Sequence, residues 1–138
     1  MDKSDDERQL LILSVLSFEE GANQSAVVAQ VVRALQQLAV HFRPLMGSSG
    51  FFALYLRSVH LNRAQHACLA PLSTMERDDT HFTALQASLS SADTEQAARA
   101  GIAVIETLTG LLAGLIGLPL TMRLLTTAWA NAAEGKPL

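Results

Sequence analysis

The stretch that decides the fold is SAVVAQVVRALQQLAVHF, residues 25–42. Its larger apolar side chains recur every three or four residues, so in a helix they share one face with a seven-residue period. Alternation of apolar and polar residues with a period of two, which a half-buried strand needs, is not sustained here or elsewhere in the chain. The stretch therefore predicts an amphipathic helix. Its inward face comprises Val28, Val31, Val32, Leu35, Leu38, Ala39 and Phe42.

Start and stop signals predict further helices on both sides of this one. Ser4–Glu7 and Ser73–Glu76 are capping boxes, and Pro119 suits the first turn of a last helix. The helix expected after Gly47 is apolar nearly all round, which predicts a central position. The expected helices span approximately residues 5–19, 25–42, 48–69, a short one from 73, 93–116 and 119–133. We therefore predict an all-α protein, a single helical bundle of five or six helices.

The composition predicts one folded domain and excludes several classes of protein. The chain has 138 residues, of which 49% are hydrophobic and 17% charged, with a net charge of −3. This length supports one core, and the apolar share is too high for a disordered chain. A single cysteine excludes an internal disulfide framework, and four scattered histidines give no structural zinc pattern. We expect one domain over residues 1–138, with flexible ends at 1–4 and 134–138.

Two features of the sequence predict a cytoplasmic location: the lack of a secretory signal at the N-terminus and the poor match of the longest apolar segment to a membrane span. Four of the first seven residues are acidic, so the positively charged region of a secretory signal is missing. The segment Ile102–Met122 is long enough to cross a bilayer. However, Glu106 lies inside it, Gly117 and Pro119 interrupt it, and no basic or aromatic belt flanks it. We expect a buried core helix, and membrane association ranks third among the functional hypotheses.

A short likeness between two segments allows a second interpretation of the bundle. PLMG at 44–47 and GLIG at 114–117 each end a long helix, and each is followed by a helix that carries an arginine. The chain would then consist of two related helical hairpins. Glycines that end helices and Leu-rich helices also recur by chance in a chain rich in Ala and Leu. The low sequence identity between the two segments favours a chance likeness over a duplication.

Positive charge is concentrated in one acid-free part of the chain. Residues 21–75 contain no Asp or Glu but four arginines and three histidines. Arg57, His60 and Arg63 follow one another at spacings of three, so they can converge on one partner. Together with Arg43 they are the candidate ligand- or anion-binding residues, because guanidinium groups bind phosphate and carboxylate in bidentate fashion.

Internal ion pairs are the alternative for these charges, and the apolar character of the helix favours it. The arginines of this helix would then pair with Glu106, Asp78 or Asp79 inside the bundle. Glu106 and Arg123 are the only charges between residues 101 and 133. We expect Glu106 to form a buried ion pair with Arg123 or with Arg57.

The sequence gives no sign of an active site, a cofactor or a metal. His60, His66 and Cys68 are spaced by six and two residues, which places them on different faces of a helix and disfavours a metal site. Nucleophile signatures, glycine-rich phosphate loops and Cys-x-x-Cys pairs are absent. We therefore expect a protein that is not an enzyme and has neither cofactor nor metal.

The apolar surplus predicts a non-enzymatic helical interaction or regulatory module. If one small bundle cannot cover all apolar helix faces, the remainder meets a partner. We expect a homodimer or a complex with another protein, in signalling of the bacterial type. The expected interface residues are Leu11, Val15, Phe18, Leu125 and Trp129.

The runner-up is a small-ligand sensor with an apolar pocket in the bundle. Arg57 or His60 would orient the acidic head group of the ligand there. Nucleic acid is disfavoured as a partner, because the pI is about 5.7, aromatic residues are few and no helix has a dense Lys/Arg face.

Overall fold

The computed structural model describes residues 3–16, 23–66, 69 and 82–129. These residues form five α-helices and contain no strand, which confirms the prediction of an all-α bundle. The helices are α1 (Lys3–Val15), α2 (Gln24–Asn62), α3 (Thr83–Ser90), α4 (Thr94–Ile116) and α5 (Leu118–Ala128).

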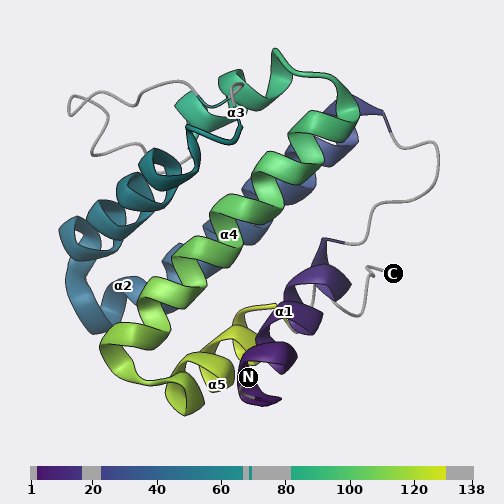
Figure 1. Cartoon of the computed structure of the whole chain (residues 1–138). Helices are drawn as coiled ribbons and strands as arrows, with labels where there is room; N and C mark the ends of the chain where they lie inside the picture. Colours follow the sequence, from purple (N-terminus) through teal and green to yellow (C-terminus); the bar gives the residue numbers. More distant parts are fainter. Residues whose placement is uncertain (1–2, 17–22, 67–68, 70–81, 130–138) are drawn as a thin grey trace, which may run out of the picture.

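The longest helix, α2, consists of two limbs that meet at a sharp bend at Gly47. We call residues 24–46 the first limb and residues 48–62 the return limb. The first limb and α4 run in the same direction and lie against each other (Figure 1). They are in tight contact at Gly101, because a methyl group at this position would lie 2.5 Å from Cγ2 of Val31. This pair of parallel helices is the spine of the bundle.

The two halves of the described chain follow one plan, displaced by 70 residues. Asn23 and Asp93 cap α2 and α4 in the same way, each accepting a hydrogen bond from the amide three residues later at 2.9 and 2.8 Å. Each cap is followed by a straight run of helix, residues 24–46 and 94–116, and then by a glycine with positive φ. Gly47 has φ 83° and ψ 157°, and Gly117 has φ 93° and ψ 146°. A second helix then runs back in each half.

Burial follows the same plan, because equivalent positions are buried in both halves. The small helices agree in part: α3 packs on α2 and α1 packs on α4, in each case the long helix of the other half, but α3 also packs on α4 and α1 on α5. The two halves therefore share a helical arrangement that extends beyond the short likeness of residues 44–47 and 114–117. The equivalent buried pairs include Val27 and Ala97, Leu35 and Ile105, Leu38 and Leu108, Phe42 and Leu112, Tyr55 and Leu125, and Val59 and Trp129.

The inward face predicted for residues 25–42 is confirmed, since all seven of its members are buried. Phe82, Leu85 and Leu89 are also buried as the helical spacing predicts. Phe82 has a left-handed backbone (φ 55°) where α3 begins. Its ring meets the ring of Tyr55 edge-on, with centroids 4.9 Å apart, and joins α3 to the return limb.

Several expected boundaries were wrong. The first limb does not end at Phe42 but passes through Pro44 to Met46, since a proline removes one helical hydrogen bond whereas Gly47 turns the chain. The return limb ends at Asn62 rather than at residue 69, and α1 begins at Lys3. The capping box at 73–76 and the end of the helix expected at 133 lie outside the described residues.

The central helix is α4, not the helix after Gly47. The return limb lies at the edge of the bundle and leaves Leu61 49% exposed. By length and composition alone, α4 is the one helix of the described chain able to cross a bilayer. Eight of its residues are buried among the other helices. The core helix of a soluble bundle can have the same length and apolar composition.

Candidate functional site

The return limb of α2 directs two of the basic candidate residues to solvent. Arg57 and His60 are exposed, and Arg63, just after the helix end, is half-buried. The opposite face is fixed by Asn62, whose Nδ2 donates to the Ser58 carbonyl at 2.8 Å and to Thr107 Oγ1 of α4 at 2.9 Å. Because this inner face is bound to α4, the basic residues are held on the outer face.

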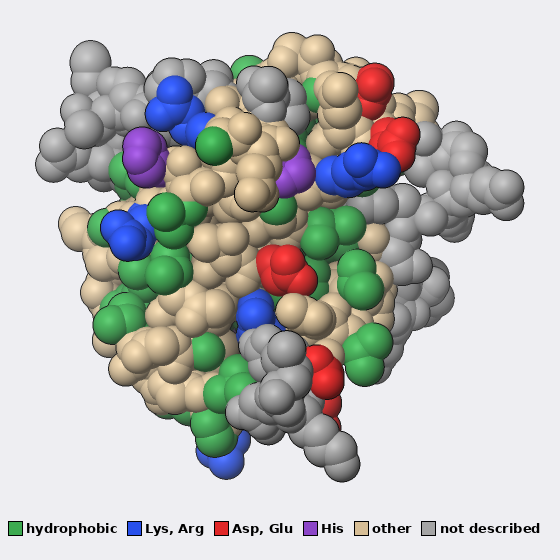
Figure 2. Space-filling model, viewed as in Figure 1, with side chains coloured by type: hydrophobic (Ala, Val, Ile, Leu, Met, Phe, Trp, Pro, Cys, Tyr) green, Lys and Arg blue, Asp and Glu red, His purple; other side chains and the backbone are tan. Residues whose placement is uncertain are grey.

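The expected internal ion pairs of these residues are not found in the described chain. Within its described ranges, Arg43, Arg57 and Arg63 form no ion pair with Glu106 or any other acid. Asp78 and Asp79, the other expected partners, lie outside these ranges. In Figure 2, blue and purple side chains without red neighbours lie along the left edge of the molecule, over the return limb, and further blue side chains lie near the red ones in the centre and on the right.

Arg43 does not join the other three basic candidates on one surface element. It lies on the first limb, before the bend at Gly47, and is half-buried. The structure thus groups Arg57, His60 and Arg63 on the return limb and leaves Arg43 on the other side of the bend.

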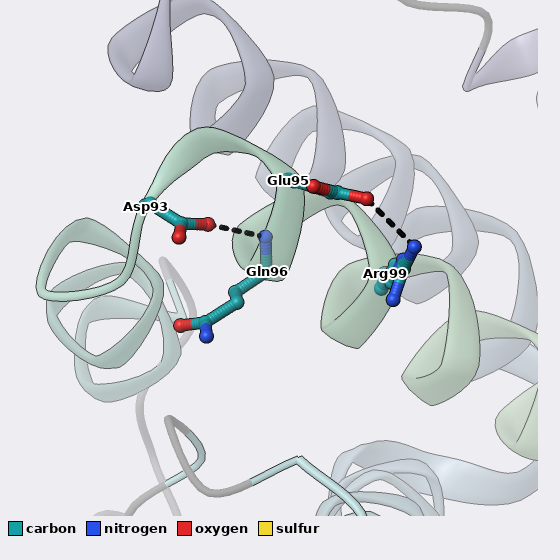
Figure 3. A network of polar contacts seen from close by, with 4 residues as sticks. All are labelled: Asp93, Glu95, Gln96 and Arg99. Carbon is teal, nitrogen blue, oxygen red and sulfur yellow. Dashed lines mark hydrogen bonds and ion pairs between the residues drawn. The ribbon is translucent and has the colours of Figure 1, made fainter.

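The acidic side chains at the start of α4 form a local cluster of their own (Figure 3). Glu95 Oε2 lies 2.6 Å from Nη2 of Arg99 one turn later, and both side chains are more than two thirds exposed. Asp93 is occupied as the helix cap and accepts from the amide of Gln96. An exposed pair of this kind contributes at most about 0.5 kcal/mol. We therefore assign this cluster to helix capping and solvation.

The buried ion pair expected between Glu106 and Arg123 is wrong. Glu106 is half-buried on α4, Arg123 is exposed on α5, and no ion pair joins them. An arginine on the outer face of α5 keeps its hydration and needs no internal partner, whereas burial would remove that hydration.

Arg8 is the charged residue that is buried in the described part of the chain, and the sequence did not predict it. Its side chain is 7% exposed, and Nη1 donates to the Glu106 carbonyl at 2.7 Å and to Thr109 Oγ1 at 2.6 Å. The guanidinium lies over Gly110, where a methyl group would come within 3.8 Å of Nη2. Arg8 stands three and four residues before Leu11 and Ile12, and this helical spacing places it on the same face of the helix as those apolar residues.

The expected interface residues mostly belong to the core. Val15, Leu125 and Trp129 are buried, and Trp129 Nε1 donates to the carbonyl of Ala34 at 3.2 Å. Leu11 is half-buried against the core, and Phe18 lies outside the described residues. The helices of the same chain cover Val15, Leu125 and Trp129, so these three side chains are not available to a partner.

Other large apolar side chains are exposed instead. Leu45 on the first limb and Leu115 on α4 are 54% and 64% exposed, and they are equivalent positions of the two halves. Each lies two residues before a bend glycine, so both are at the end of the bundle where the two chain reversals lie (Figure 1). We call this surface the corner end. It consists of the exposed residues Pro44, Leu45, Leu115, Pro119 and Leu120.

The corner end is uncharged over two long segments. Residues 44–56 and 107–122 contain no Asp, Glu, Lys or Arg. The surface is therefore apolar, with serine and threonine as its polar side chains, and it is formed by parts of α2, α4 and α5.

In the described part of the chain, no three His, Cys, Asp or Glu side chains lie together as a metal-binding group. Comparison of the chain with models of protein families, with curated proteins and with solved structures gave no significant match.

Proposed function

We propose that this chain is a non-enzymatic helical interaction module that self-associates through the corner end. The observation that carries the proposal is the matched exposure of Leu45 and Leu115 at one uncharged end of the bundle. Exposed leucines are unfavourable in water, and grouped ones are typical of interaction surfaces.

A second copy of this chain fits the corner end better than a charged partner does. With no charge in either segment, the surface offers nothing for electrostatic recognition. It is built from two equivalent halves, so a two-fold arrangement can place Leu45 of one copy against Leu115 of the other, and the reverse. Three exposed leucines are a small contact compared with the roughly 800 Å² per partner of a standard interface, so we expect a weak, reversible dimer.

Sedimentation equilibrium over a range of protein concentrations tests this proposal. The wild-type chain should pass from monomer to dimer as the concentration rises, whereas the Leu45→Glu/Leu115→Glu variant should stay a monomer. Leu10→Glu is the matched control, because Leu10 is 65% exposed on α1 and is not part of the corner end. A wild-type chain that stays monomeric at every concentration, or equal loss of the dimer in Leu10→Glu, would contradict the proposal.

The runner-up hypothesis, a small-ligand sensor, receives less support. It needs Arg57 or His60 to face an apolar pocket between helices, and both side chains are exposed on the outer face of the return limb. Such positions suit contact with another macromolecule. The cytoplasmic location and the role in signalling stay predictions from the sequence.

A further inference from the structure

We propose that the return limb of α2 also binds an acidic amphipathic helix of a partner protein. The surface involved, which we call the basic strip, consists of Arg57, His60, Leu61 and Arg63. It lies on the outer face of the bundle rather than at the corner end, so the proposal does not depend on self-association.

The first observation is that no acidic side chain described in the structure pairs with the arginines of the strip. Helix α2 has no acidic residue from Gln24 to Asn62, and none follows up to residue 66. The acidic residues with described side chains belong to α1, to α4 and to its cap, and none of them forms an ion pair with Arg57 or Arg63. A surface whose described charges all have one sign attracts and orients a partner of the opposite sign.

An apolar side chain between the charges indicates the kind of acidic partner. Leu61 is 49% exposed and follows His60 directly, so a ligand on the strip must offer an apolar contact beside its acidic groups. Arg57 and Leu61 are four residues apart in the helix and both are exposed, so they lie on one line along its surface, as a bound amphipathic helix requires. The strip has no exposed aromatic ring on which a nucleic acid base could stack.

The strip is held rigidly, which lowers the cost of binding. Val59 and Tyr55 on the inner face are 1% exposed, and Asn62 is bonded to Thr107 of α4. A ligand therefore meets side chains on a fixed helix, and little backbone ordering is needed when it binds.

Fluorescence anisotropy with a synthetic peptide tests the proposal on the full chain. The probe is a fluorescein-labelled helical peptide with Glu at spacings of three and four and Leu beside them, and the control probe has Gln in place of each Glu. We expect the Glu peptide to bind and to weaken as salt is added, because exposed charge pairs are screened. The Gln peptide should bind at least about tenfold more weakly, because it lacks the charges that the strip attracts.

Charge reversal on the protein locates the binding surface. Arg57→Glu/Arg63→Glu should weaken binding of the Glu peptide at least about tenfold, because two attractions become repulsions. Arg123→Glu is the matched control: Arg123 is exposed on α5, the return helix of the other half, and its reversal should change binding less than about twofold. Circular dichroism checks that each variant keeps its helix content.

Four results on the strip itself would overturn the proposal. These are binding unaffected by the double reversal, an equal effect of Arg123→Glu, equal affinity for the Gln peptide, and competition by single-stranded DNA at the same charge concentration. The last result would identify a general polyanion surface instead. Loss of peptide binding in the folded Leu45→Glu/Leu115→Glu variant would also overturn it, because the strip would then depend on the corner end.

Discussion

Gly101 of α4 lies directly against Val31 of α2, and the two positions are equivalents of each other in the two halves of the chain. A residue that touches its own equivalent must lie next to the axis that relates the two halves. Because the two long helices run parallel, this axis runs along them, and the two bends at Gly47 and Gly117 fall at the same end of the bundle. The corner end thus follows from the parallel direction of the two long helices and the equivalent positions of their bends.

Gly101→Ala should destabilise the fold. The new methyl group would lie 2.5 Å from Cγ2 and 3.0 Å from Cγ1 of Val31, so the helices must separate. Overpacking of this kind costs about 1–3 kcal/mol, partly offset by about 1 kcal/mol from the better helix propensity of alanine. Urea denaturation measures the change. Val31→Ala in the same chain should recover part of the loss, and a purely additive double variant would contradict a direct contact.

Gly114→Ala is the control for that variant and a prediction in its own right. Gly114 lies in the same helix, and no atom beyond its chain neighbours and the backbone of its own helix lies within 4 Å of the position where a methyl group would be. Alanine should therefore raise the free energy of unfolding by about 0.5–1 kcal/mol through its helix propensity. A destabilised Gly114→Ala variant would show that some contact covers this position.

Gly47→Ala and Gly117→Ala should each lower stability by a similar amount. Both glycines have positive φ with extended ψ, a conformation that is almost restricted to glycine. Nothing lies within 4 Å of a methyl group at 47, so backbone strain is the cause there and crowding is not. We expect a loss of about 1–3 kcal/mol for each in urea denaturation. A clear difference between the two would contradict the equivalence of the bends.

The sequence predicts helix content well and the arrangement of the helices less well. The spacing of apolar residues identified the buried face of residues 25–42, and Asp93 marked the start of α4. The helix end predicted before Pro44 was wrong, because the helix passes through the proline and bends only at Gly47. The tertiary contact that makes α4 central depends on the absence of a side chain at Gly101, which no hydrophobic pattern reports.

The candidate site was predicted in part. Helical spacing correctly placed Arg57 and His60 on one side of a helix, but it did not show whether that side faces solvent or Glu106. The expectation that Val15, Leu125 and Trp129 form an interface was wrong, because a segment that is strongly apolar in sequence is the one that the fold covers first. Trp129 is the clearest case, being 1% exposed.

Arg8→Met should destabilise the bundle by removing the polar bond between α1 and α4. The variant leaves Thr109 Oγ1 and the Glu106 carbonyl without the charged donor that they have at 2.6 and 2.7 Å. Hydrogen bonds from a charged group contribute about 1.5–3 kcal/mol, and methionine retains much of the apolar stem. Thermal unfolding measures the loss. Arg33→Met is the control, since Arg33 is exposed on α2 and its change should stay within about 0.5 kcal/mol.

Trp129→Phe should loosen the end of α5 from the first limb of α2. The variant loses the hydrogen bond from Nε1 to the Ala34 carbonyl, which costs about 0.5–1.5 kcal/mol, since that carbonyl keeps the backbone hydrogen bond of its own helix. The chain has one tryptophan, so its fluorescence reports on this contact alone in the wild-type protein. Because the ring is buried, its emission should be blue-shifted and shielded from acrylamide in the native state, and should move to the red on unfolding. Emission that is already solvent-like in the native protein would show that α5 does not pack on α2 in this way.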